Sequence, residues 1–318
     1  MIISASRRTD IPAFYTEWFL RRLREGFVRV VNPFNTRQVS EISLRREDVT
    51  CLVFWTKNAA PLLARLGELE ETGIPFYFQF TVTPYGRDIE PGLPEKAAVV
   101  RTFQRLAARI GRGRTVWRYD PILLTEKYSV AWHSEQFRNL LAVLAPCTDT
   151  CVLSFLDLYA KTERNTRTLG LLPLGEEEMR ALAAGFSEAA RGSGVVLKSC
   201  AEAIDLVPYG IAHGACIDRT RLEKILGGRL AIQKDPTQRG ACQCVKSVDI
   251  GAYNTCGHLC RYCYANFNAQ MARALLAAHD PAAPSLTRPS PGAKVTYPKG
   301  DRVTVKKDAE FEEGTLFS

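Results

Sequence analysis

Short apolar runs alternate along this chain with longer segments of helical periodicity. Eight of the runs are rich in Val, Ile, Leu and Phe, a pattern typical of parallel strands that are buried on both faces. They occupy residues 2–6, 28–31, 51–55, 76–81, 115–119, 152–155, 195–199 and 248–253. We therefore expect a sheet of eight strands, most of them parallel.

The intervening segments carry apolar residues at the spacing of amphipathic helices. The two clearest stripes are Val99, Phe103, Leu106 and Ile110, and Phe137, Leu140, Leu141 and Leu144. Asp10 followed by Pro12 is a typical helix start, as is Asn58 followed by Pro61. Eight strands that alternate with helices predict an α/β fold, specifically a (β/α)8 TIM-like barrel.

The chain divides into a body and a tail. We expect residues 1–278 to form the barrel, with a cysteine-rich loop at 200–247 and a second cysteine loop at 254–264. Prolines recur from residue 279 onward, which predicts an extended tail over 279–318. The sequence has no apolar stretch long enough for a membrane span and no signal-peptide pattern, so a cytoplasmic protein is expected.

Composition narrows the chemistry only partly. The 318 residues are 46% hydrophobic and carry a formal net charge of +8. That charge would suit an anionic partner, including nucleic acid or a phosphorylated substrate, but it is also common on ordinary soluble surfaces. The ten cysteines are a stronger signal, because clustered thiols in a reducing compartment more often bind metal than form disulfides.

In a barrel, the carboxyl ends of the strands meet on one rim, where active sites lie. Most of the predicted strands lead into polar residues at that end, so we expect a charged pocket there. Its members are Ser6, Arg7, Arg8, Asp10, Trp55, Gln79, Arg118, Asp120 and Lys198.

Several of these side chains have two readings. Arg7 and Arg8 could bind a carboxylate or phosphate, or form ion pairs with neighbouring aspartates. Lys198 could be a proton donor with a shifted pKa, or an ion-pair partner. Asp120 could accept hydrogen bonds from a ribose or cap a strand end.

One motif near the end of the body carries the most specific chemistry. Cys256, Cys260 and Cys263 follow a C-x-x-x-C-x-x-C spacing, with Tyr262 just before the last cysteine. Three thiolates would leave one iron of a [4Fe–4S] cluster without a protein ligand, as a catalytic cluster requires. Zinc, with His258 or an upstream cysteine as fourth ligand, is the alternative. We expect a helix to start at Tyr264.

A second group of cysteines precedes this motif. Cys200, Cys216, Cys242 and Cys244 lie in the long loop after the seventh predicted strand. Four thiolates could close a second, auxiliary [4Fe–4S] cluster, or hold a structural zinc, or be buried packing residues. The remaining three cysteines lie in or beside predicted core strands and are expected to pack there.

The three-cysteine motif resembles that of the radical S-adenosylmethionine (SAM) superfamily. The resemblance implies that the cluster binds SAM at its open iron and cleaves it reductively to a 5′-deoxyadenosyl radical, which abstracts hydrogen from a substrate. It also implies an electron donor such as ferredoxin or flavodoxin, and a cofactor pocket that includes Ser6, Asp10, Trp55, Gln79, Arg118, Asp120 and Tyr262.

The motif is displaced relative to that superfamily, where it usually follows the first barrel strand. Here it follows the eighth, which implies a circularly permuted barrel with residues 2–6 beside the cysteine loop. The neighbouring strand of the superfamily ends in a Gly-Gly-Glu-like run that binds the SAM amino group. Asp10 is the candidate for that role, and the candidate catalytic side chains are Arg7, Arg8, Asp10 and Lys198.

The whole chain also resembles an uncharacterised bacterial and archaeal family. The shared segments are the opening 4–12, Ser-Ala-Ser-Arg-Arg-Thr-Asp-Ile-Pro, and the closing 253–266 with its cysteine motif. The substrate, small or macromolecular, is not readable from these residues. Two other functions stay open: a non-radical iron–sulfur or zinc protein, and a nucleic-acid-modifying protein.

Overall fold

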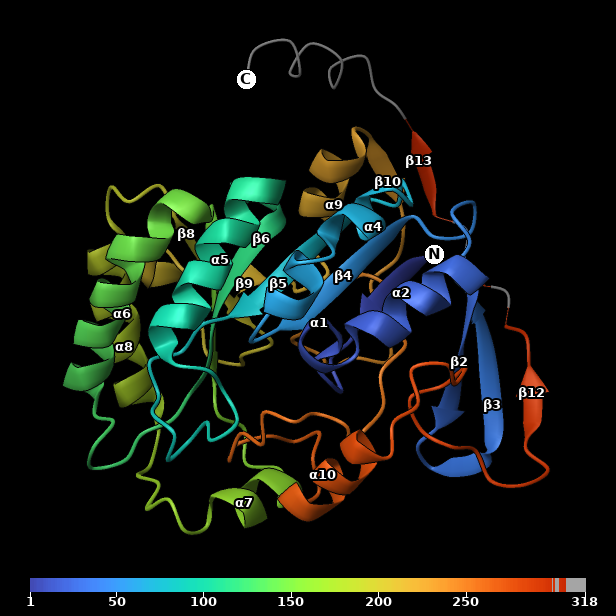
Figure 1. The fold of residues 1–318 in the computed structure, drawn as a ribbon. Coiled ribbons are helices and arrows are strands. Elements are labelled where there is room, and N and C mark those ends of the chain that lie inside the picture. The colour runs from blue at the N-terminus through green and yellow to red at the C-terminus, as the bar shows by residue number, and fades with distance from the viewer. Residues whose placement is uncertain (299, 301–302, 307–318) are drawn as a thin grey trace.

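The computed structural model describes residues 1–298, 300 and 303–306. Its main element is a sheet of eight strands in the order β11-β1-β4-β5-β6-β7-β8-β9 (Figure 1). All of the neighbouring pairs run parallel. The strands are β1 (Ile2–Ala5), β4 (Cys51–Thr56), β5 (Phe76–Thr81), β6 (Thr115–Ile122), β7 (Thr150–Phe155), β8 (Val196–Cys200), β9 (Ala212–Gly214) and β11 (Val248–Asp249). The predicted α/β class is confirmed.

The central strands behave as their apolar runs predict. Every residue of β5 and of β7 is buried, because helices cover the sheet. Helices α6 (Val130–Leu144) and α8 (Glu176–Ala190) pack together on one side of it. Phe137 of α6 stacks on Phe186 of α8 with centroids 4.2 Å apart, and on Trp117 of β6 at 5.1 Å. The apolar residues that predict α6 are thus on the face of the helix that packs against the sheet.

The strand predicted at 28–31 does not belong to the main sheet. It is part of β2 (Phe27–Asn32), which pairs antiparallel with β3 (Asn35–Ser43) in a separate three-stranded sheet. Only one residue of β2 is fully buried, so the run faces solvent more than a barrel strand would. Its place among the eight is taken by β9, which is only three residues long and has no apolar run for sequence reasoning to detect.

The helices start largely where caps predict them. Asp10 caps α1 (Ile11–Phe14) by accepting a hydrogen bond from the Ala13 amide at 3.0 Å. The other helices are α2 (Thr16–Glu25), α3 (Ala60–Leu63), α4 (Leu66–Glu70), α5 (Lys96–Ile110), α7 (Ala160–Thr166), α9 (Arg219–Leu226) and α10 (Ala269–Ala277). None of the helices in the described part of the chain is long and apolar enough to cross a membrane.

The helix predicted to start at Tyr264 begins later. Asn268 caps α10 by accepting from the Met271 amide at 2.8 Å, so the helix starts at Ala269. The residues before it bond back to the cysteine loop: the Asn266 side chain donates to the Cys256 carbonyl at 2.8 Å. These tertiary bonds compete with helical ones and keep the segment irregular.

The segment from residue 279 onward packs on the body. The buried Trp18 indole donates to the Ala283 carbonyl at 2.9 Å, and the Arg29 amide donates to the Pro284 carbonyl at 2.8 Å. Further on, β12 (Lys294–Thr296) adds to β3, and β13 (Thr304–Lys306) pairs with β10 (Arg229–Ala231). The rest of the predicted tail, residues 299, 301–302 and 307–318, lies outside the described residues.

Candidate functional site

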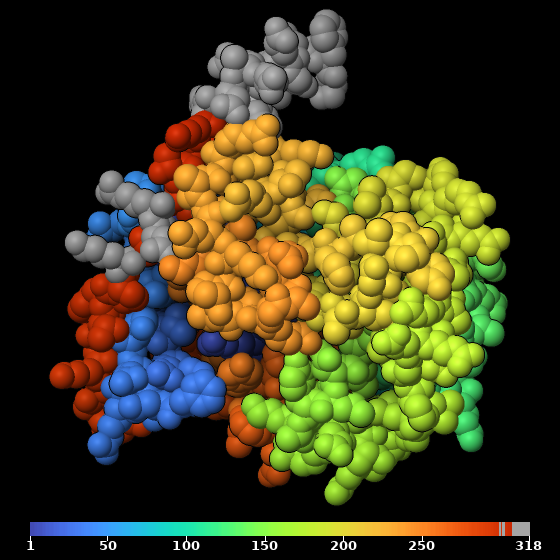
Figure 2. All heavy atoms as spheres, turned by 180° about the vertical axis from the view of Figure 1, so that it is seen from behind, coloured from blue at the N-terminus to red at the C-terminus, as the bar shows by residue number. Residues whose placement is uncertain are grey.

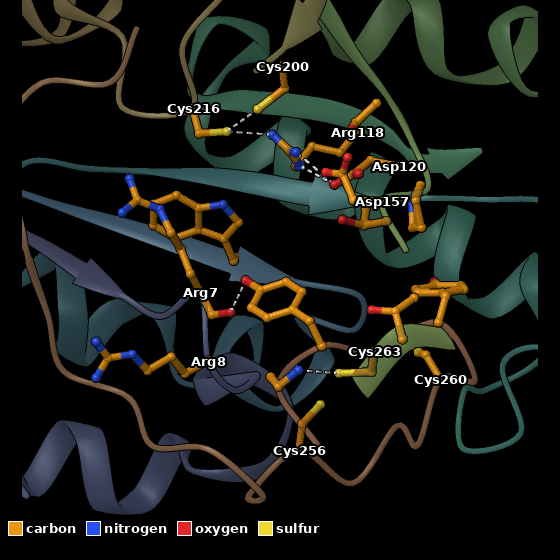
Figure 3. Close-up of a pocket in the computed structure, with 18 of the residues that line it drawn as sticks. Arg7, Arg8, Arg118, Asp120, Asp157, Cys200, Cys216, Cys256, Cys260 and Cys263 are labelled. Carbon is orange, nitrogen blue, oxygen red and sulfur yellow. Dashed lines mark hydrogen bonds and ion pairs between the residues drawn. The ribbon is translucent and has the colours of Figure 1, made fainter. Parts of the chain in front are cut away.

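A cavity of about 730 Å³ opens at the carboxyl ends of the parallel strands (Figure 3). This is the rim where α/β sheets bind their ligands. All seven cysteines of the two predicted groups line it, although they come from loops far apart in the sequence. The other predicted site residues on its wall are Ser6, Arg7, Arg8, Asp10, Trp55, Arg118, Asp120 and Tyr262. Gln79 and Lys198 are not among the described residues that line it.

Hydrogen bonds to backbone carbonyls, and not a helix or strand, hold the loop that carries Cys256, Cys260 and Cys263. The buried Tyr15 hydroxyl donates to the Thr255 carbonyl at 2.5 Å, and the Gly92 amide donates to the His258 carbonyl at 3.0 Å. Gly92 has to be glycine, because a Cβ there would lie 2.5 Å from the Gly257 carbonyl oxygen.

Cys260 is buried and Cys256 and Cys263 are partly buried, and loss of solvation raises the pKa of each thiol. The pKa of Cys256 lies well above its ordinary value, and that of Cys260 is about 12. Burial also raises the pKa of Cys263, although the Ala265 amide donates to its sulfur at 3.3 Å. Such thiols become thiolates only beside a strong positive charge, which a bound metal supplies.

Asp10 connects the first strand, the third predicted strand and the cysteine loop. Its carboxylate accepts from the Thr56 hydroxyl at 2.8 Å, the Lys57 amide at 2.7 Å and His258 Nε2 at 2.8 Å, in addition to its capping bond. Four donors occupy most of the lone pairs of one carboxylate. Asp10 is therefore positioned to orient the loop through His258.

Glu90 is a site residue that sequence reasoning missed. Its fully buried carboxylate forms ion pairs with Lys57, at 2.8 Å, and with Lys96, and accepts from the Tyr262 hydroxyl. Burial opposes its ionisation, but the two ammonium groups prevail and lower the pKa of Glu90 to about 2. A permanently charged Glu90 thus anchors Tyr262, the aromatic residue of the cysteine motif.

The other four cysteines come from neighbouring segments on the same cavity wall. Cys200 Sγ and Cys216 Sγ are 3.1 Å apart, and the Ile217 amide, next to Cys216, donates to Cys244 Sγ at 3.4 Å. Hydrogen bonds from Cys200 and Cys244, with Arg118 nearby, lower the pKa of Cys216 well below its ordinary value. A hydrogen bond from Cys244 lowers the pKa of Cys242 to about 6. The same hydrogen bonds, together with burial, raise the pKa of Cys200 and of Cys244, so negative charge is favoured on Cys216 and Cys242 alone.

Two residues predicted to bind cofactor contact Cys216. Arg118 Nη1 donates to Cys216 Sγ at 2.9 Å, and its other nitrogens pair with Asp120 at 2.7 and 3.1 Å. Gln79 Nε2 donates to the Cys216 carbonyl at 2.7 Å, from behind the cavity wall. Arg118 and Gln79 therefore support the second cysteine group directly.

Two other candidates have structural partners. Lys198 Nζ donates to Asp218 at 2.9 Å, as an ion pair at the start of α9. The Ser6 hydroxyl donates to Asp249 at 2.7 Å, and the Ser4 hydroxyl does the same. Asp249, which sequence reasoning did not single out, joins β1 to β11 through these bonds.

Proximity of the cysteines is distinct from metal coordination. In the part of the chain that the structure describes, no group of three or more His, Cys, Asp or Glu side chains is gathered so that it could hold one metal ion. The structure establishes that both cysteine groups face one cavity.

Comparison with known proteins places this chain in a family but supplies no activity. No curated protein and no solved structure matches it. A family model described as "Domain of unknown function (DUF1848)" matches residues 2–265, a range that contains both cysteine groups and every side chain that lines the cavity. The chain is a member of the DUF1848 family.

Proposed function

We propose that this protein is an iron–sulfur enzyme of the radical SAM type. The observation that carries the proposal is the C-x-x-x-C-x-x-C run of Cys256, Cys260 and Cys263, whose three side chains line a cavity at the carboxyl ends of a parallel sheet. A three-thiolate site leaves one iron open, which suits a catalytic cluster and not a structural one.

The residues fit such a cluster. Each thiolate of a [4Fe–4S] cube binds a different iron, so the sulfurs need not converge on one point as they would for a single ion. When bound, the cluster would supply an open iron for SAM and the electron that cleaves it, drawn from a donor such as ferredoxin or flavodoxin. In this proposal Cys256, Cys260 and Cys263 hold it, and Asp10 and Glu90 position the loop through His258 and Tyr262.

The displaced motif has a simple explanation in the proposal. The cysteine loop follows β11, and β11 pairs in parallel with β1, Ile3 opposite Val248. The loop therefore neighbours the first strand, as a circular permutation of the usual radical SAM order requires. Closure of the sheet between β9 and β11 into a (β/α)8 barrel is part of this proposal.

We assign an auxiliary [4Fe–4S] cluster to Cys200, Cys216, Cys242 and Cys244. Four thiolates suit a closed site, and the Arg118 guanidinium on Cys216 would offset its negative charge. Structural zinc is the competing occupant, since zinc also takes four thiolates. Metal analysis distinguishes the two.

The test is anaerobic reconstitution followed by iron analysis and incubation with SAM and dithionite. Two clusters predict about eight iron atoms per chain and formation of 5′-deoxyadenosine. The C260A variant should retain about half of the iron and produce no 5′-deoxyadenosine, because only the loop cluster is lost. The matched control is C147A, a cysteine outside both groups, which should leave both readouts unchanged.

Three results would contradict the proposal. Zinc in place of iron would point to a structural metalloprotein. A full complement of iron without SAM cleavage would point to an electron-transfer protein. Loss of all iron in a folded C260A protein would exclude two independent sites.

A further inference from the structure

The six cationic side chains on the cavity wall fall into two sets by their partners. In the first set each cation faces a carboxylate: Lys57 pairs with Glu90, Arg118 with Asp120 and Arg239 with Asp157. In the second set each cation lies over an aromatic ring, and its members are Arg7, Arg8 and Lys161. Arg8 also pairs with Asp249 at 4.0 Å. The first set is neutralised and Arg8 partly so, and Arg7 and Lys161 therefore carry most of the positive charge of the cavity.

Arg7 has a buried hydrogen-bond donor that is left without an acceptor. Its guanidinium carbon lies 5.1 Å from the centre of the Trp55 ring. Its Nη2 nitrogen is buried and has no hydrogen-bond partner among the described residues. A buried donor without a partner is destabilising, and more so when it is charged. The nearby Asp249 does not relieve it, because that carboxylate already accepts from Ser4, Ser6 and two backbone amides.

Lys161 and Arg8 share one aromatic ring. Lys161 Nζ lies 4.9 Å from the Tyr253 centre and 4.0 Å from that of Phe267, and the Arg8 guanidinium lies 5.3 Å from Tyr253. An aromatic face attracts a cation without occupying its N–H groups. These rings therefore hold the cations in place and leave their donors available to a ligand.

We infer that Arg7, assisted by Arg8 and Lys161, binds an anionic group, a carboxylate or a phosphate, of a small-molecule substrate. Guanidinium groups match the geometry of both anions. The cavity, at about 730 Å³, lies within the usual range of small-molecule sites. The inference rests on the proposed function in one respect: it treats this cavity as the chamber in which the substrate reacts.

SAM itself carries a carboxylate, so it is a second source of the same chemistry. Arg7 favours the substrate, because its guanidinium interacts electrostatically with Cys216 and Cys244 of the four-cysteine group, whereas its backbone carbonyl faces the three-cysteine loop and accepts from the Tyr264 hydroxyl at 2.6 Å. Figure 3 shows Arg7 between the two groups of labelled cysteines. An anion on the Arg7 guanidinium would thus lie between the two cysteine groups.

The experiment measures two affinities on the reconstituted protein by equilibrium dialysis, one for radiolabelled inorganic phosphate and one for SAM. We expect R7Q to weaken phosphate binding at least tenfold and to leave SAM affinity unchanged within twofold. R7K should lose less phosphate affinity than R7Q, because lysine keeps the positive charge. K161M should also weaken phosphate binding. K127M is the control, since Lys127 pairs with Asp88 away from the cavity wall.

Two outcomes would overturn the inference: equal phosphate affinity in the wild type and R7Q, or an equal loss of SAM affinity in R7Q, which would assign Arg7 to the SAM carboxylate. If R7Q does not fold by circular dichroism, K161M carries the same test. Phosphate binding is measured without turnover, so a wild type that binds phosphate through Arg7 but forms no 5′-deoxyadenosine would refute the proposed function alone.

Discussion

At the scale of single residues, buried charges with complete sets of partners build the cavity wall. Arg118 is the example nearest to the cysteines: one of its nitrogens contacts Cys216 and two contact Asp120. Glu90 is the example nearest to the loop, since it holds Lys57, Lys96 and Tyr262 at once. Burying a charge is costly unless it is paired and hydrogen-bonded, so removing one partner should affect the rest.

We predict that E90Q destabilises the protein by about 3 kcal/mol at pH 7, because it leaves two lysines beside an uncharged amide. The folded pKa of Glu90, about 2, lies below the ordinary glutamate value. Its contribution is therefore complete above about pH 5 and is lost as the pH falls toward 2. Urea unfolding of E90Q should depend less on pH in this acidic range than unfolding of the wild type.

The control for this prediction is E95Q, because Glu95 forms an exposed ion pair with Arg87. Exposed pairs contribute little, so E95Q should unfold like the wild type. Equal stability of E90Q and E95Q at pH 7 would show that the Glu90 ion pairs are not needed.

At the scale of elements, the cysteine loop depends on one very short strand. β11 has two residues, paired with β1 at Ile3 and Ser4. Two ladder positions cannot hold a strand firmly, and Asp249 supplies the rest by accepting from the Ser4 and Ser6 hydroxyls at 2.7 Å and from the Arg7 amide at 2.8 Å. A side chain thus substitutes for backbone pairing.

We predict that D249A lowers the free energy of unfolding by about 2–4 kcal/mol, because several buried donors lose their acceptor. In D249A, hydrogen exchange of the amides in 249–256 should become faster than in the wild type, while exchange in the central strands β5 and β6 should change less. D249N should recover part of the loss, since its amide oxygen still accepts. Unchanged protection at 249–256 in D249A would contradict this role.

At the scale of the whole molecule, chain segments distant in sequence complete one body. Figure 2 shows residues from about 200 to 250, in yellow and orange, gathered on one face of the molecule, and Figure 1 shows β12 beside β3 and β13 beside β10. The buried Trp18 and Arg22 of α2 both donate to carbonyls of the 279–286 segment. The boundary expected at residue 278 therefore cuts through packed structure.

We predict different results for two truncations. A chain ending at 278 should lose at least about 3 kcal/mol of stability, because the buried Trp18 and Arg22 lose their acceptors and Leu286 no longer packs on the core. A chain ending at 292 keeps these contacts and, among the elements that the structure describes, lacks β12 and β13, so its unfolding temperature should be close to that of the wild type. Thermal unfolding measures both, and equal stability of the two truncations would contradict the prediction.

Part of the candidate site could be predicted from short stretches of sequence. Asp10 before Pro12 predicts a helix cap and is one. The rule that parallel strands present their carboxyl ends at one edge predicts that both cysteine groups face the same cavity, and they do. Glu90 and Asp249 had no such signal, because a lone acid in a loop or short strand is usually solvated. Their partners lie up to 172 and 245 residues away.

The sequence by itself determined the α/β class, the buried parallel strands and the residues suited to bind metal or anions. Continuous apolar runs, the 3.6-residue spacing of helices and side-chain chemistry are local properties of the chain. Only the tertiary structure decided that residues 28–31 leave the main sheet and that β9 joins it. It also decided which cations on the cavity wall pair with carboxylates and which lie over aromatic rings. Strand partners and ion pairs are made between segments far apart in the chain, so their identity depends on the folded packing and not on any window of sequence.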